Sequence, residues 1–134
     1  MSMTRINSRQ KGKRGERLVC KMLTEATGCE WRRTAQVRGK NDGAPDIECL
    51  DLKYAGLWVE VKDRACWYVG CKAWADAWGT TCEEAWSRNK EPVLVWRAAR
   101  GRFVVSFFHV GLVVTYDCLG DGVMYAAGAN PLAA

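Results

Sequence analysis

The strongest constraint on the fold is a long helical segment that lies between two apolar strands. In Leu57–Asp63, apolar residues at every second position predict a strand with one buried face. Pro92–Ala98 is a second apolar strand. Between them, Lys72–Asn89 has apolar residues at helical spacing, although Gly79 weakens the pattern: Trp74, Trp78, Cys82 and Trp86. A strand, a helix and a strand in this order predict a parallel crossover.

Other segments add a helix and antiparallel strands. An apolar stripe predicts a helix from about Ser8 to Thr27, ended by Gly28. Asp46–Leu52 pairs with Leu57–Asp63 as a hairpin that turns through Lys53–Gly56. Two more strands and a loop are expected: strands Trp31–Val37 and Phe103–Phe108, and loop Arg38–Pro45. The expected fold is therefore α/β, with a mixed central sheet flanked by helices.

The C-terminal segment is ambiguous. His109–Tyr125 fits either a strand pair with a turn at Gly120–Gly122, or a short helix followed by a strand. We expect a single domain over residues 1–134, with a flexible basic lead over 1–7. Residues 109–134 are expected to be a C-terminal extension that could serve dimerisation.

The charge is concentrated at the N-terminus. Residues 1–40 carry eleven Lys or Arg and three Glu, a net charge of +8, whereas the remainder has a net charge of −3. This asymmetry suggests a polyanionic partner, or else a solvated basic arm that binds nothing in particular. Apolar runs are too short for a membrane span or a signal peptide, so we expect no membrane association and a cytoplasmic location, in a cell or a virus-infected cell.

The seven cysteines predict neither a disulfide scaffold nor a zinc site. Their number is odd, no C-x-x-C pair occurs, and the chain has one histidine, His109. We expect them to be reduced and mostly buried.

The hairpin brings together the residues that could carry chemistry. A turn near residues 53–56 places Asp46 opposite Lys62, within about one residue, and period two puts Glu60 and Lys62 on one face. Two carboxylates at one point repel unless a cation neutralises them, and such oxygen ligands suit Mg²⁺ or Mn²⁺. Phosphodiester hydrolysis needs a metal ion, a water molecule oriented by a group such as lysine, and stabilisation of the charge that develops on the phosphate. The alternative is an ordinary surface ion pair between Glu60 and Lys62.

Two more acidic residues, Glu16 and Glu48, are candidates for the same site. Glu16 lies on or beside the apolar face of its helix, where a carboxylate is costly unless a metal site or a buried arginine pairs it. The alternative is that it only interacts favourably with the helix dipole. Glu48, two residues after Asp46, could compete as a metal ligand.

Over residues 7–108, the ordered motifs resemble the PD-(D/E)-x-K nuclease superfamily, and most closely the archaeal-type Holliday junction resolvases with their phage and bacterial relatives. The motifs that carry the resemblance are K-G-x-x-G-E-R from Lys11, Arg33-Thr34-Ala35, Pro45-Asp46-Ile47, Val59-Glu60-Val61-Lys62, Tyr68-Val69-Gly70 and Pro92-Val93-Leu94-Val95. The resemblance implies a restriction-endonuclease-like core.

The resemblance also implies roles for individual residues. Asp46 and Glu60 match the metal-binding acids, with the Val61 carbonyl as a further ligand, and Lys62 matches the catalytic lysine. Glu16 matches a helical glutamate that assists the metal site directly or through water. Arg17 and Arg33 match basic residues that contact DNA phosphates. From charge and position we add further phosphate-contacting candidates: Lys11, Lys13, Arg14, Arg32, Arg38 and Lys40.

These observations predict a Mg²⁺-dependent, structure-selective endonuclease, with Mn²⁺ as a possible substitute. The expected enzyme is a homodimeric Holliday junction resolvase that makes paired symmetric nicks in four-way DNA junctions. The alternatives are another PD-(D/E)-x-K repair, recombination or restriction-like nuclease, and a non-catalytic DNA-binding protein of the same fold.

Overall fold

The computed structural model describes residues 3–34, 44–64, 67–98 and 101–128. Within them, one mixed sheet has six strands in chain order. They are β1 (Trp31–Arg33), β2 (Ile47–Cys49), β3 (Leu57–Lys62), β4 (Glu91–Arg97), β5 (Phe103–His109) and β6 (Leu112–Tyr116). Strands β3 and β4 are parallel and every other neighbouring pair is antiparallel, which confirms the predicted crossover and the predicted hairpin.

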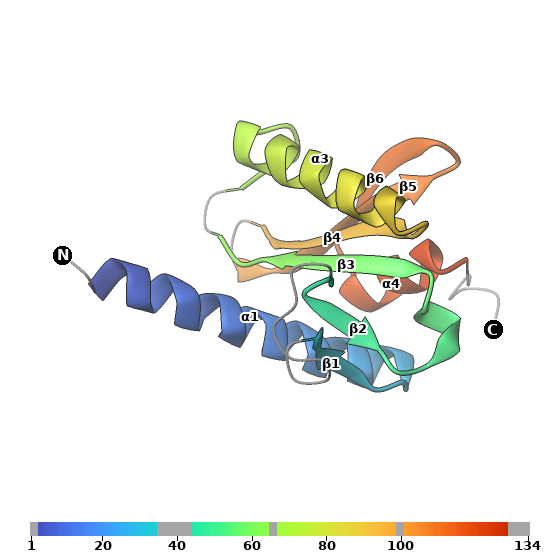
Figure 1. Cartoon of the computed structure of the whole chain (residues 1–134), viewed down its shortest axis with the longest axis horizontal. Coiled ribbons are helices and arrows are strands. Elements are labelled where there is room, and N and C mark those ends of the chain that lie inside the picture. The colour runs from blue at the N-terminus through green and yellow to red at the C-terminus, as the bar shows by residue number, and fades with distance from the viewer. Residues whose placement is uncertain (1–2, 35–43, 65–66, 99–100, 129–134) are drawn as a thin grey trace.

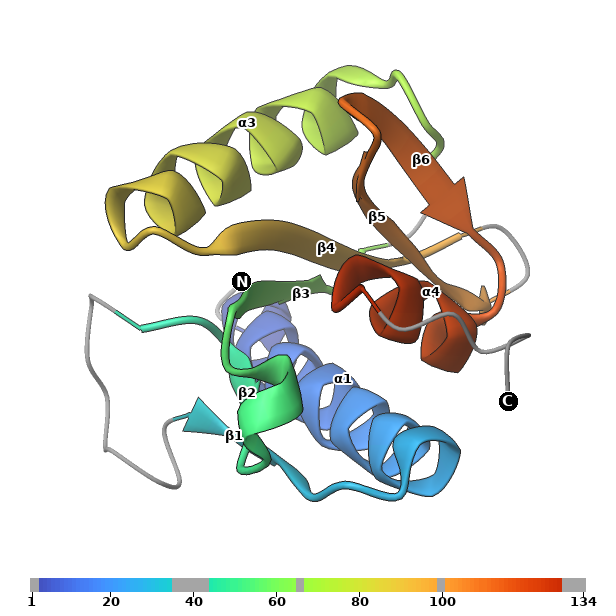
Figure 2. The same cartoon turned by 90° about the vertical axis from the view of Figure 1, so that its right-hand side faces the viewer.

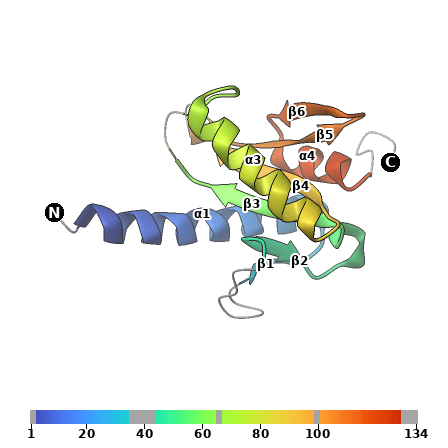
Figure 3. The ribbon, with the colours of Figure 1, turned by 45° about the horizontal axis from the view of Figure 1, so that its top comes forward.

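Helices cover both faces of this sheet, in three layers (Figures 1 and 2). The crossover helix α3 (Lys72–Ser87) packs on one face, while α1 (Met3–Thr27) and α4 (Leu119–Ala126) pack on the other. A 3₁₀ turn, η1 (Leu52–Tyr54), joins β2 to β3. The N-terminal part of α1 extends past the sheet (Figure 3). None of the helices in the described ranges is long and apolar enough to cross a membrane.

The two faces of the sheet have separate apolar cores. Val19 and Leu23 of α1 pack with Val123 of α4 against the inward residues of the strands. On the opposite face, Trp74 and Trp78 of α3 form the second core with other apolar side chains: Cys82, Leu94, Trp96 and Val104. Alternate residues of β4 therefore belong to different cores, Val93 and Val95 to the first and Leu94 and Trp96 to the second, which is the period-two pattern of a strand buried on both sides.

Helix α1 and the C-terminal segment differ from the predictions. Helix α1 begins at Met3 rather than Ser8. The C-terminal segment is a strand followed by a helix, so both predicted alternatives were wrong. Gly120 and Gly122, which were predicted to form a turn, lie inside α4. A Cβ on Gly120 would lie 2.5 Å from the Ala26 Cβ, and a Cβ on Gly122 would collide with Val105. These glycines allow α4 to approach α1 and β5 closely.

The cysteines are less buried than predicted. Among the described residues, Cys20 and Cys82 are buried, Cys118 is exposed and three are intermediate: Cys29, Cys49 and Cys71. These six are free thiols, as predicted, and Cys66 lies outside the described residues. Burial raises the pKa of the Cys82 thiol to about 11, so this thiol behaves as a core residue.

Candidate active site

The acidic residues of the hairpin meet because of its register. Ile47 pairs with Val59, and the Asp46 N–H donates to the Val59 carbonyl at 3.2 Å. Asp46 therefore lies beside Glu60, and the prediction that it lies opposite Lys62 was wrong. The connection between the strands contains η1, capped by the Asp51 side chain, and this is longer than the tight turn that the sequence suggested.

Asp46 and Glu60 are in direct contact. Their carboxyl groups hydrogen-bond to each other. One oxygen of Asp46, Oδ2, also accepts the Val61 N–H at 2.8 Å. The acceptor for this N–H of β3 is therefore a side-chain oxygen and not a backbone carbonyl of β2. Glu60 is only 9% exposed. Burial, and then the charge of Asp46, raise its pKa far above the ordinary 4.5, into the alkaline range.

Trp58 holds the Glu60 carboxyl in place. Its indole Nε1–H donates to Glu60 Oε1 at 2.9 Å, and both side chains are buried. The two residues are two apart on β3 and so share the α3 face. Trp58 was not among the predicted site residues. The signal was available, because period two places the tryptophan next to the glutamate.

Glu16 reaches the site from α1. Its Oε1 accepts a hydrogen bond from Arg33 Nε at 2.9 Å, and the side chains are 20% and 11% exposed. Burial raises the pKa of Glu16, the bond to Arg33 lowers it, and the charge of Asp46 raises it again, while Lys62 has a smaller lowering effect. A buried arginine is therefore what pairs this carboxylate, one of the two explanations that its position suggested. The electrostatic influence of Asp46 and Lys62 places Glu16 near them.

A cavity of about 310 Å³ opens beside these residues, between the end of β3 and α3. Glu60 and Lys62 line it from the sheet. The rest of its lining comes from the following segment and α3: Arg64, Trp67, Ala73, Asp76, Ala77, Thr80, Thr81 and Glu84. The charge of Glu84 contributes a small further rise in the pKa of Glu60, so α3 adds negative charge to this site. Arg64 and Glu84 were not among the predicted site residues.

The metal-ligand prediction can be compared with the donor set that the structure provides. The described part of the chain contains no group of three or more His, Cys, Asp or Glu side chains arranged to hold a metal ion. It does contain two touching carboxylates, Asp46 and Glu60, and oxygen donors of this kind are those that Mg²⁺ prefers. Two carboxylates in contact repel each other unless they share a proton. A bound cation would take the place of that proton and neutralise the repulsion.

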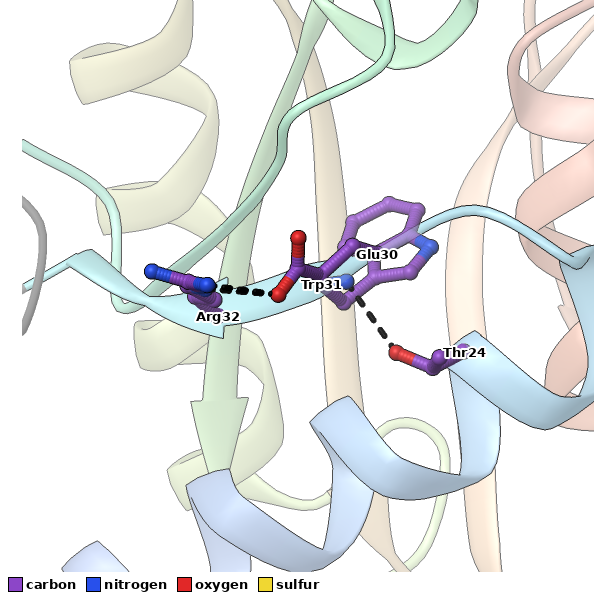
Figure 4. A network of polar contacts seen from close by, with 4 residues as sticks. All are labelled: Thr24, Glu30, Trp31 and Arg32. Atoms are coloured by element: carbon purple, nitrogen blue, oxygen red, sulfur yellow. Dashed lines mark hydrogen bonds and ion pairs between the residues drawn. The ribbon is translucent and has the colours of Figure 1, made fainter.

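The predicted DNA-contacting residues fall into three groups. Lys13, Arg14 and Arg17 are exposed on α1. Arg32 is half-exposed, but it forms an ion pair with Glu30 at 2.7 Å. Figure 4 shows this pair next to the hydrogen bond from the Trp31 N–H to Thr24. Arg33 forms an ion pair with Glu16. The remaining candidates cannot be placed, because Arg38 and Lys40 lie outside the described residues, as does the Lys11 side chain.

An ion pair closes the end of β3 beyond Lys62. The Asp63 side chain is 5% exposed and accepts a hydrogen bond from Arg97 Nε at 2.7 Å, so Asp63 is the partner of Arg97 in a salt bridge. Helix α1 crosses directly above this pair: a Cβ on Gly15 would lie 2.8 Å from the Asp63 Cβ. The glycine just before Glu16 therefore lets α1 come close enough to bring that carboxylate to the site.

The comparison with known families fits this geometry. A family model described as "Phage putative PDDEXK endonuclease" matches residues 7–114, well over half of the chain. No curated protein and no solved structure matches the chain. The predicted superfamily and the restriction-endonuclease-like fold are thereby confirmed, while the resolvase specificity stays a prediction. With its Asp46, Glu60 and Lys62 gathered at the end of one hairpin, the chain belongs to the phage PDDEXK endonuclease family.

Proposed function

We propose that this nuclease is a divalent-metal-dependent DNA endonuclease selective for branched DNA, with four-way junctions as its preferred substrate. Mg²⁺ is the proposed cofactor, with Mn²⁺ able to substitute. The observation that carries the proposal is the contact between the Asp46 and Glu60 carboxyls, two residues from Lys62. A folded protein keeps the buried acid Glu60 in contact with the half-buried acid Asp46 at a cost, and binding a cation offsets that cost.

Three groups would hold the ion: the carboxylates of Asp46 and Glu60 and the main-chain carbonyl of Val61. The carbonyl is supported by strand geometry. The N–H and C=O of one strand residue point to the same side, and the Val61 N–H points to Asp46. Glu16 would assist from α1, through water or directly. When bound, the ion would polarise the scissile phosphate and lower the pKa of a water.

The other residues orient and balance charge. Lys62 lies on the same face as Glu60 and lines the cavity, where its ammonium can orient the attacking water or stabilise charge that develops on the phosphate. Trp58 fixes the rotamer of Glu60, and Arg33 fixes Glu16. Chemistry of this kind needs geometry held within a fraction of an ångström, and these bonds supply it.

We propose that DNA binds across the exposed basic residues of α1, next to the site. Lys13, Arg14 and Arg17 are the members of the predicted group best placed to meet phosphates, and Arg64 at the mouth of the cavity is an addition to it. Contacts to backbone phosphates give binding that weakens steeply with salt. Such contacts read shape and charge rather than sequence, as selectivity for a junction requires.

We also propose that the enzyme acts as a homodimer of single-domain subunits, in the cytoplasm where its DNA substrate would be. Two linked nicks need two sites at a fixed separation, which a two-fold dimer supplies. The C-terminal segment, residues 109–134, is the proposed contact region. In support, β6 is an edge strand of the sheet, and apolar side chains on and beside it are exposed: Val110 at 87%, Leu112 at 70% and Val113 at 39%.

A cleavage assay tests this function. A four-way junction and a linear duplex of the same sequence are incubated with the protein, with Mg²⁺ or with EDTA. We expect paired nicks in the junction when Mg²⁺ is present and none in EDTA. Asp46→Asn and Glu60→Ala should lose cutting but still bind the junction. Glu25→Gln, a control at an exposed position of α1, should cut like the wild type. Equal cutting of both substrates would leave a nuclease without junction selectivity. Binding without cutting would favour a non-catalytic DNA-binding protein.

A further inference from the structure

One buried hydroxyl near the site has no partner. Thr34 follows β1 directly and is 3% exposed. Its Oγ1 makes no hydrogen bond to any part of the chain that the structure describes. Leaving a buried hydroxyl without a partner costs about 1–3 kcal/mol, and native proteins tolerate few such groups. The unpaired hydroxyl therefore calls for a partner that the described part of the chain does not supply.

The strand register places Thr34 next to Asp46. Strands β1 and β2 pair Arg32 with Glu48 and Arg33 with Ile47. The ladder continues one step further, because the Thr34 N–H donates to the Asp46 carbonyl at 3.0 Å. Thr34 is helical and Asp46 lies in a bend, just beyond the paired residues of β1 and β2. This hydrogen bond places Thr34 next to Asp46, whose carboxyl interacts with that of Glu60.

A ligand of the site would lie within reach of this hydroxyl. Oδ2 of Asp46 accepts the Val61 N–H at 2.8 Å, and the Glu60 carboxyl hydrogen-bonds to that of Asp46. A cation held by these two acids keeps several water molecules, because Mg²⁺ loses its hydration shell reluctantly. A water on the β1 side of the ion would need a hydrogen-bonding partner from the protein.

We propose that the Thr34 hydroxyl binds a water of the divalent cation held by Asp46 and Glu60, and so helps to retain that cation. The inference rests on the proposed metal dependence. It explains why a polar atom stays buried and unpaired at this one position beside the acids. Outer partners of a metal site commonly contribute tenfold or more to affinity. The hydroxyl therefore trades stability of the empty protein for affinity toward the ion.

Two measurements on the same variants separate this role from a structural one. Thr34→Val keeps the shape and removes the hydroxyl, and Thr34→Ser keeps the hydroxyl. We expect Thr34→Val to melt at or above the wild-type temperature in EDTA, because a hydroxyl without a partner is removed. Titration calorimetry with Mn²⁺ should show an affinity about tenfold weaker for Thr34→Val, with Thr34→Ser near wild type.

Thr27→Val is a matched control, because it removes a hydroxyl that has hydrogen-bonding partners. Thr27 Oγ1 donates to the Leu23 carbonyl at 2.7 Å and accepts the Trp31 indole N–H at 3.1 Å. It should lower the melting temperature and leave Mn²⁺ affinity unchanged. Mn²⁺ binding by Thr34→Val as tight as wild type overturns the role of Thr34, and so does a lower melting temperature of Thr34→Val in EDTA. Absence of Mn²⁺ binding by the wild type overturns the metal proposal itself and this inference with it.

Discussion

Replacing Glu60 by glutamine should stabilise the metal-free protein at neutral pH. Glutamine keeps the oxygen that accepts the Trp58 N–H and removes the charge that burial and Asp46 disfavour. Because the folded-state pKa of Glu60 is raised, the folded protein retains a proton that the unfolded chain releases. The contribution of Glu60 to stability should therefore be fully present below pH 4.5, the ordinary pKa, and should be lost as the pH rises above it.

The size of the effect follows from the pH interval. Between the ordinary pKa of 4.5 and pH 7, the unfolded chain gains about 1.4 kcal/mol per pH unit from releasing the proton. The folded protein gains nothing over this interval, because its Glu60 stays protonated. The wild type should therefore lose about 3 kcal/mol that Glu60→Gln keeps, which is about 10 °C in melting temperature for a domain of this size.

Urea unfolding in EDTA at several pH values measures this difference. The stabilities of wild type and Glu60→Gln should agree near pH 4.5 and diverge by pH 7. Glu25→Gln, an exposed substitution on α1, should follow the wild type throughout. Parallel pH profiles for wild type and Glu60→Gln would refute the reasoning, since they would mean that Glu60 ionises in the folded protein as readily as in the unfolded chain.

Three further predictions concern side-chain pairing and packing in the fold. Arg33→Gln removes the partner of a half-buried α1 carboxylate and should cost about 2 kcal/mol in urea unfolding, with an unchanged far-UV spectrum. Ser106→Ala leaves two buried indole N–H groups without their acceptor and should cost about 2 kcal/mol or more; a loss under 0.5 would contradict that bonding. Gly15→Ala should lower the melting temperature because its Cβ would clash with Asp63, whereas Gly12→Ala, which has open space, should raise it slightly.

The sequence predicted the parts of the fold that depend on periodicity. Strand β3 and helix α3 carry long, regular patterns, and their type, order and parallel crossover were correct. The C-terminal helix α4 was not predicted, because Gly120 and Gly122 are typical of a turn in the sequence. In the structure they allow close packing of the helix. Packing against a distant segment is a tertiary property, which local patterns do not encode.

The site was predictable in its members but not in its register. Glu60 and Glu16 each lie near Asp46, while the catalytic and metal-binding roles of these residues stay predictions. The pairing of Asp46 with Glu60 depends on how many residues the connection consumes, and the 3₁₀ turn capped by Asp51 fixes that number. An unpaired hydroxyl such as that of Thr34 has no sequence signal, because any buried threonine looks the same until its neighbours are known.

The indole bond to Glu60 also gives the enzyme an optical property. The indole N–H groups of Trp31, Trp74 and Trp96 donate to neutral hydroxyls, whereas that of Trp58 donates to a carboxyl. Ionisation of Glu60, or capture of its charge by an ion, changes the electric field at that ring. The fluorescence of Trp58 will therefore change with the state of the site, so occupancy can be followed in solution without a label or a substrate.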